Sequence, residues 1–230
     1  MSYEATRVKR VGNSVKELLG MGLVHQAVDL LIAEGQGGHV TIGALTTPIV
    51  GGGNGTTIEI AQPAGILNIA PNAVMIPVRF KVECEVGGVA ADDEVDEILI
   101  AVDTGNAADG VNETTAVNEQ VYNMRGDLGN GLAGLVSAWS AVTTNLTTAP
   151  VHTMELDRAQ HHREFGDATG LQITKFELLY EPVHPPLLAG ASNLGAAVYV
   201  DWAGTVAVSG FAQLQFVIFP KQWVYGFGND

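Results

Sequence analysis

The residues with the greatest potential for chemistry lie between positions 152 and 167. Histidines and carboxylates are interspersed there: His152, Glu155, Asp157, His161, His162, Glu164 and Asp167. Zinc hydrolases favour the spacing His-Glu-x-x-His on one helical face, and this spacing does not occur here. His161 and His162 are adjacent, so their side chains point in different directions. We therefore expect a polar loop or an interface segment. A pH-sensitive contact and a hydrolase site using His161, His162 and Glu164 stay open as alternatives.

A second candidate is the segment "DTGNAADGVNE", which could hold a calcium ion. Its oxygen donors are Asp103, Asn106, Asp109, Asn112 and Glu113. Hard oxygen ligands in a glycine-containing loop suit calcium, but the spacing is not that of an EF-hand. Turns rich in Asp and Asn look the same without an ion. We therefore favour a structural turn and expect no cofactor.

The glycine-rich stretch "IVGGGNGTTIEIA" raises the possibility of a phosphate-binding loop. A Walker-type loop needs a Lys-Ser/Thr pair after its last glycine and a helix behind it. Here Gly55 is followed by two threonines and a strand-like pattern. Asn54-Gly55 suits the positive φ angles of a tight hairpin turn. The stretch therefore predicts a connection between strands.

Nucleophiles and aromatic binding residues give no stronger signal. Gly-x-Ser-x-Gly is absent, and "AVSGFA" around Ser209 comes closest. Cys84 is the single cysteine and fits a small buried apolar residue on a strand. Sugar sites favour exposed aromatics beside Asp or Asn, which makes the three tryptophans candidates, but core or interface packing is the favoured interpretation. They are Trp139, Trp202 (next to Asp201) and Trp223. The sequence therefore predicts that this protein is not an enzyme.

The composition limits the class of partner. The chain has 230 residues, 47% hydrophobic and 16% charged, which predicts an ordered domain with some apolar surface covered by other copies or a partner. A net charge of −14 makes nucleic-acid binding by the body improbable. No segment has the length of a membrane span, and no signal peptide is recognisable. The basic residues are uneven, because four of the eleven fall in the first sixteen positions: Arg7, Lys9, Arg10 and Lys16.

Residues 14–34 are the best helix candidate. Ser14 and Glu17 have the spacing of a capping box, and Gly35 supplies a C-terminal stop. Apolar residues recur there at three- and four-residue spacing. We therefore expect residues 1–35 to form a basic arm with an amphipathic helix that packs against the same chain or against a neighbouring subunit. The expected interface residues are Arg7, Lys9, Arg10, Val15, Leu18, Leu19, Leu23, Leu30 and Leu31.

Residues 36–230 predict a single β-sandwich domain of jelly-roll or Greek-key type. Short Val/Ile/Thr-rich segments are bounded by Gly, Asn, Asp or Pro, as in strands. The expected strands are "HVTIGALTTPIV", "TTIEIA", "VMIPVRFKVECEV", "DEILIAVDTG", "LQITKFELLYEPV", "AAVYVDWAG" and "FAQLQFVIFPKQWV". Positions 78–86 alternate between apolar and charged residues, which indicates an antiparallel sheet with one buried face. Residues 104–150 read as long loops with a short helix near "GLAGLVSAWSAV".

Two segments carry a resemblance to a known class of protein. They are "TIEIAQPAGILNIAPNAVMIPVRFKVECEV" and "FELLYEPVHPPLLAGASNLGAAVYVDWAGTVAVSGFAQLQFVIFP". Their order of strands and turns resembles tailed-phage virion proteins of the capsid-associated or decoration type, over residues 40–220. The resemblance implies a bacteriophage structural protein without catalytic residues, located in the virion and assembled in the host cytoplasm. Its implied partners are copies of itself, as a homotrimer or other ring, and the major capsid protein.

Two other functions remain open. One is a receptor- or carbohydrate-binding module of a spike or fibre, because β-sandwiches serve in both roles. The other is a shell-forming jelly-roll capsid protein whose basic N-terminal arm faces the genome, although four basic residues are few for neutralising charge.

Overall fold

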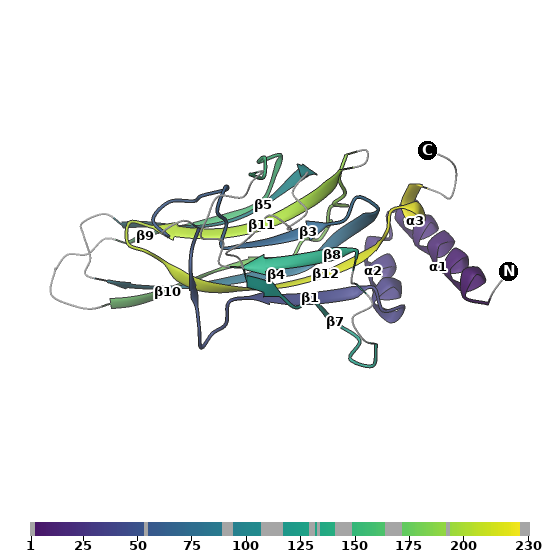
Figure 1. Ribbon diagram of the computed structural model, residues 1–230, viewed down its shortest axis with the longest axis horizontal. Coiled ribbons are helices and arrows are strands. Elements are labelled where there is room, and N and C mark those ends of the chain that lie inside the picture. Colours follow the sequence, from purple (N-terminus) through teal and green to yellow (C-terminus); the bar gives the residue numbers. More distant parts are fainter. Residues whose placement is uncertain are drawn as a thin grey trace.

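The computed structural model has two six-stranded antiparallel sheets that face each other, as the sequence predicts for a β-sandwich (Figure 1). The described residues are 3–52, 55–88, 94–106, 117–128, 132, 134–140, 149–163, 172–191 and 194–225. The first sheet contains β1 (Gly37–Ile42), β2 (Ile49–Val50), β4 (Ala73–Gly88), β7 (Tyr122–Asn123), β10 (Gln172–Tyr180) and β12 (Ser209–Pro220). The second contains β3 (Gly65–Ile69), β5 (Glu94–Asn106), β6 (Val117–Glu119), β8 (Val136–Ser140), β9 (Met154–Arg163) and β11 (Gly195–Gly204).

The strand order brings distant parts of the chain together. The first sheet runs β10-β4-β12-β1-β7, with β2 also paired to β12, and the second runs β6-β8-β3-β11-β5-β9. The first long strand, β1, therefore pairs with the last, β12, and β3 pairs with the second-last, β11. Such long-range antiparallel pairing, rather than a series of hairpins, defines the sandwich.

The main core fills the space between the two sheets. Strand β4 shows the predicted alternation, since Phe80, Val82 and Cys84 are buried in this core while Lys81 and Glu83 lie on the outer face. A second cluster, with Ile66 and Leu99 among its members, covers the outer face of the second sheet. Strand β11 is consequently buried on both faces, from Ala196 to Gly204.

The N-terminal region forms two helices, so the prediction of one helix over residues 14–34 is wrong in its bounds. Helix α1 spans Tyr3–Gly20 and α2 spans Val24–Ala33. Ser14 lies inside α1, where its Oγ donates to the Arg10 carbonyl instead of capping a helix start. Gly22 has a φ of 73°, a left-handed value that suits glycine and turns the chain between the helices. The predicted stop at Gly35, with φ 78°, is confirmed.

These helices pack on the chain's own first sheet. Val15, Val28 and Leu31 share one buried cluster with Val74, Ile76, Val217, Phe219 and Trp223, the last from the short helix α3 (Gln222–Tyr225). Val15 and Leu31 are fully buried there and are not available to a neighbouring subunit, which corrects two of the predicted interface residues. Leu18, Leu19 and Leu30 are half-buried, while Lys9, Arg10 and Leu23 are exposed. The side chain of Arg7 lies outside the described residues.

Four other predictions of local structure need correction. Residues 56–61 are irregular, with a bend and a turn instead of a strand, and "GLAGLVSAWSAV" contains strand β8 where a helix was predicted. The histidine-rich segment is not a loop over residues 154–163, because it forms the edge strand β9. The glycine-rich stretch does connect strands, as predicted. It is not a tight hairpin, however, since it leads from β2 in the first sheet to β3 in the second.

Candidate binding pocket and buried carboxylates

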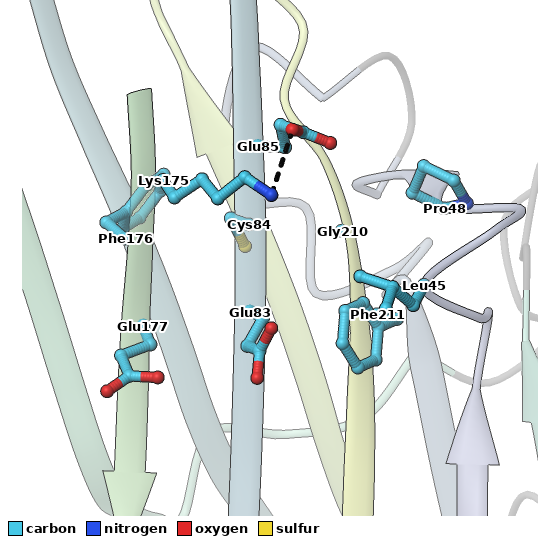
Figure 2. Close-up of a pocket in the computed structure, with 10 residues that line it drawn as sticks. All are labelled: Leu45, Pro48, Glu83, Cys84, Glu85, Lys175, Phe176, Glu177, Gly210 and Phe211. Carbon is cyan, nitrogen blue, oxygen red and sulfur yellow. Dashed lines mark ion pairs between the residues drawn. The ribbon is translucent and has the colours of Figure 1, made fainter. Parts of the chain in front are cut away.

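A pocket of about 370 Å³ opens on the outer face of the first sheet (Figure 2). Strands β10, β4 and β12 lie side by side there, with Phe176 opposite Cys84 and Cys84 opposite Gly210. The segment between β1 and β2 forms one wall. The lining residues are Leu45, Pro48, Glu83, Cys84, Glu85, Lys175, Phe176, Glu177, Gly210 and Phe211.

The floor of the pocket depends on a glycine. A Cβ at Gly210 would lie 2.9 Å from the Cys84 Sγ and 2.7 Å from the Glu83 carbonyl oxygen. The sheet therefore has room for no larger residue at this position. Burial raises the pKa of the Cys84 thiol, with smaller contributions from Asp201, Asp96 and Glu83. This agrees with the prediction of a small apolar residue, since a nucleophilic cysteine needs a lowered pKa.

The rim of the pocket is charged. Lys175 Nζ lies 3.4 Å from Glu85 Oε1, and Figure 2 shows this pair at the pocket mouth. On the same face, Lys81 bonds to Glu83 and lies 3.3 Å from Glu177, and these two hydrogen bonds raise the pKa of Lys81. Carboxylates outnumber lysines around the opening, and the walls are apolar. The arrangement suits a ligand that carries a cation on an apolar stem.

The glycine-rich stretch closes around a buried carboxylate instead of a phosphate. Asp201 is fully buried, and its Oδ1 accepts from the backbone N–H of Gly52 (2.6 Å) and of Ala64 (3.2 Å). Its Oδ2 accepts from the N–H of Glu59 at 2.8 Å. A Cβ at Gly51 would lie 1.7 Å from the Trp202 carbonyl oxygen, so only glycine permits this approach to β11. Burial raises the pKa of Asp201 to about 7, and the N–H donors oppose this rise.

The proposed calcium ligands divide between described and undescribed residues. Asp103 is buried, and its Oδ1 accepts from the Gly105 N–H (2.7 Å) while its Oδ2 accepts from the Val151 N–H (2.8 Å). Both oxygens therefore hold backbone groups, as in the structural turn that we favoured. Asn106 ends strand β5, but its side chain lies outside the described residues, as do Asp109, Asn112 and Glu113 entirely.

The histidines of β9 are dispersed. His161 pairs in register with Asp96, with 4.0 Å between Nδ1 and Oδ2, and its ring stacks on Phe176 at 5.9 Å. His162 is exposed on the other face of the strand, and His152 lies 3.8 Å from Glu155. Across the described part of the chain, no three His, Cys, Asp or Glu residues are placed to hold a metal ion. Glu164 and Asp167 lie outside that part.

The tryptophans serve packing. Trp202 is fully buried, and its Nε1 donates to the Ile49 carbonyl at 3.3 Å, while Trp223 stacks on Phe219. Trp139 is half-buried in the cluster on the outer face of the second sheet. Trp202 therefore cannot stack on an exposed sugar, which removes the main support for a glycan site beside Asp201. Ser209 lies opposite Val50 of β2 and opposite Glu85 of β4 in the first sheet, and Glu85 is paired with Lys175 at 3.4 Å.

Sequence reasoning missed both the pocket and the role of Asp201. The alternation in β4 placed Glu83 and Glu85 on one wet face. Nothing local indicated that Lys175 and Glu177 of β10 would lie beside them. For Asp201, a charged residue inside the apolar run "AAVYVDWAG" was a usable signal, since buried carboxylates require hydrogen-bond partners.

Comparison with known proteins identifies no relative from which a function could be inferred. No protein-family model matches this chain, and no curated protein is significantly similar to it. None of the helices among the described residues is long and apolar enough to cross a membrane.

Proposed function

We propose that this protein is a virion structural protein of a bacteriophage, which decorates or cements the head shell through subunit contacts and performs no catalysis. The observation that carries the proposal is the strand order. The two four-strand orders β10-β4-β12-β1 and β3-β11-β5-β9 are those expected of a jelly roll, which supports the proposal. Jelly rolls are frequent in viral capsids, although they also occur in lectins and cupins.

The described surface supports a role in assembly better than a role in catalysis. The pocket on the first sheet combines a raised cysteine pKa with paired lysines and glutamates, which does not form a nucleophile-base arrangement. Exposed apolar side chains occur at several separate places, among them Leu45, Val151 and Val183. In the proposal these contact further copies, in a trimer or another ring, and the major capsid protein of the same particle, which places the protein in the virion after assembly in the host cytoplasm.

A shell-forming capsid protein is the second candidate. The same strand order favours it, and so does the basic start of α1, which lies outside the sandwich (Figure 1). The two candidates differ in what the isolated chain builds. A decorating subunit forms small closed rings and binds a preformed particle, whereas a shell subunit forms closed shells by itself.

The test is the mass of purified protein by light scattering after size exclusion, followed by negative-stain electron microscopy. The chain has a mass of 24.1 kDa, so a monomer, a trimer and a shell are easily separated. A discrete ring that binds empty phage heads supports decoration, and megadalton closed particles support the shell-forming alternative. A monomer at all concentrations that does not bind to heads refutes both.

A further inference from the structure

We propose that the outer-face pocket receives the basic end of α1 from a second copy of the chain, so that copies join head to tail. The inference rests on the proposed structural function and deepens it by naming the two surfaces in contact. Three observations support it. The pocket carries more carboxylates than lysines, and α1 has exposed cations without a described partner. The pocket and α1 also lie far apart on the same molecule.

The charges of the two surfaces are complementary. Three carboxylates and one lysine line the pocket, and Lys81 on the same face bonds to Glu83 and lies 3.3 Å from Glu177, so carboxylates exceed lysines by one at this surface. The first sixteen residues contain four basic side chains and one acidic side chain, whereas the whole chain has a net charge of −14. Lys9 and Arg10 are exposed on α1, and neither has an ion pair or a side-chain hydrogen bond among the described residues. Two of the four basic side chains at the start of α1 therefore lack a described partner within their own chain.

The shape and chemistry of the pocket suit such side chains. Lysine and arginine place aliphatic stems against apolar surface and keep their charged ends near water or a carboxylate. Leu45, Pro48 and Phe211 offer the apolar wall, and Glu83 and Glu177 lie at one end of the opening (Figure 2). A volume of about 370 Å³ admits more than one such side chain.

The helix of the same chain cannot fill this pocket. Strand β12 runs from the pocket, at Phe211, to Phe219, which packs against Trp223 beside α1. Eight steps along a strand span about 26 Å. Figure 1 shows α1 and α2 at one end of the sandwich and β10, which lines the pocket, toward the other end. Helix α1 would have to leave its buried contacts at Val11 and Val15 to reach the pocket.

A contact between two different surfaces has a defined consequence. Each copy offers one helix and one pocket, so the interface is heterologous, and it closes into a ring or continues as an open chain. Contacts of this kind between exposed charges weaken as salt rises, because the Debye length falls from about 10 Å at 0.1 M to about 3 Å at 1 M.

The experiment uses two charge variants of the full chain. The helix variant is Lys9→Glu with Arg10→Glu, and the pocket variant is Glu83→Gln with Glu177→Gln. Lys16→Glu, farther along α1, and Glu181→Gln, which pairs with Arg79 on the same sheet face, are matched controls. Circular dichroism and urea unfolding first establish that all four fold like the wild type.

The readout is sedimentation velocity of each variant alone and of the two mixed. We expect each variant alone to be a monomer, with self-association weakened at least ten-fold, and the controls to assemble as the wild type does. The mixture retains one intact helix and one intact pocket, so it should stop at a one-to-one complex that 1 M salt dissociates. Variants that still assemble like the wild type overturn this inference and leave the proposed function standing. A wild type that neither assembles nor binds phage heads overturns both.

Discussion

Replacing Asp201 with Asn should change how the stability of this protein depends on pH. Burial of Asp201 raises its pKa from 3.8 to about 7, although backbone N–H groups, among them those of Gly52, Glu59 and Ala64, donate to the carboxylate. A raised pKa means that the folded protein holds this proton more tightly than the unfolded chain. The contribution of Asp201 is therefore fully present below pH 3.8 and is lost as the pH rises to about 7.

The size of the effect follows from the same two pKa values. A rise from 3.8 to about 7 corresponds to about 4 kcal/mol in the free energy of unfolding. Asn imitates the neutral acid in size and in its carbonyl oxygen but does not titrate. Near pH 4 Asp201 is protonated, so the wild type and the Asn variant each place one hydrogen-bond donor beside the Glu59 N–H. Their free energies of unfolding should therefore agree to within about 1–2 kcal/mol at this pH. It should be more stable than the wild type near pH 7.5.

The assay is urea unfolding of both proteins at intervals between pH 4 and pH 8. The difference between the two unfolding free energies isolates Asp201, because every other group titrates in both proteins. We expect this difference to move in favour of Asn by about 4 kcal/mol across the range. A constant difference would refute the reasoning. A difference that moves toward the wild type as pH rises would mean that the N–H donors stabilise the charge by more than burial destabilises it.

Three further predictions test the packing and the candidate sites. Gly51→Ala places a methyl group 1.7 Å from a β11 carbonyl oxygen and should cost about 3 kcal/mol or more in urea unfolding, whereas Gly126→Ala, with no atom within 4 Å, should stay within about 0.5 kcal/mol. Asp103→Ala leaves two backbone N–H groups unpaired and should lower the free energy of unfolding by about 3 kcal/mol. A loss of stability that is measured only when calcium is present would instead support a calcium site at Asp103. Because burial raises the pKa of Cys84, its thiol should resist Ellman's reagent until the protein unfolds; rapid labelling of the folded protein would contradict its burial.

The sheets were predictable wherever one face of a strand meets water. In β4 the alternation of apolar and charged residues identified the buried face correctly, because successive side chains on a strand point to opposite sides. The same alternation holds in β9, where the sequence predicts a loop although His161 is half-buried and His162 is exposed. The helix bounds were wrong because Ser14 matched a capping pattern that an earlier helix start overrides.

The site was less predictable than the fold because it depends on pairing between distant segments. Lys175 and Glu85 meet through the register of β10 and β4, and Gly210 reaches the pocket through β12. No local pattern specifies which strands become neighbours, since hydrophobic alternation fixes only the face of each strand. Asp201 shows the same limit, because the backbone donors around it come from a segment about 140 residues earlier.

The high apolar content is explained largely by packing within the chain, so it is weak support for assembly with other copies. Composition suggested apolar surface that other copies would cover. Instead, α1 and α2 cover part of the outer face of the first sheet, and Ile58 and Ile60 pack against the outer face of the second. Much of the apolar surplus is thus used for two extra clusters besides the main core. The case for assembly then depends on strand order and on the uneven distribution of charge. An assembly driven by burying a large apolar surface would tolerate salt, whereas one driven by the basic start of α1 and the acidic pocket should dissociate in it.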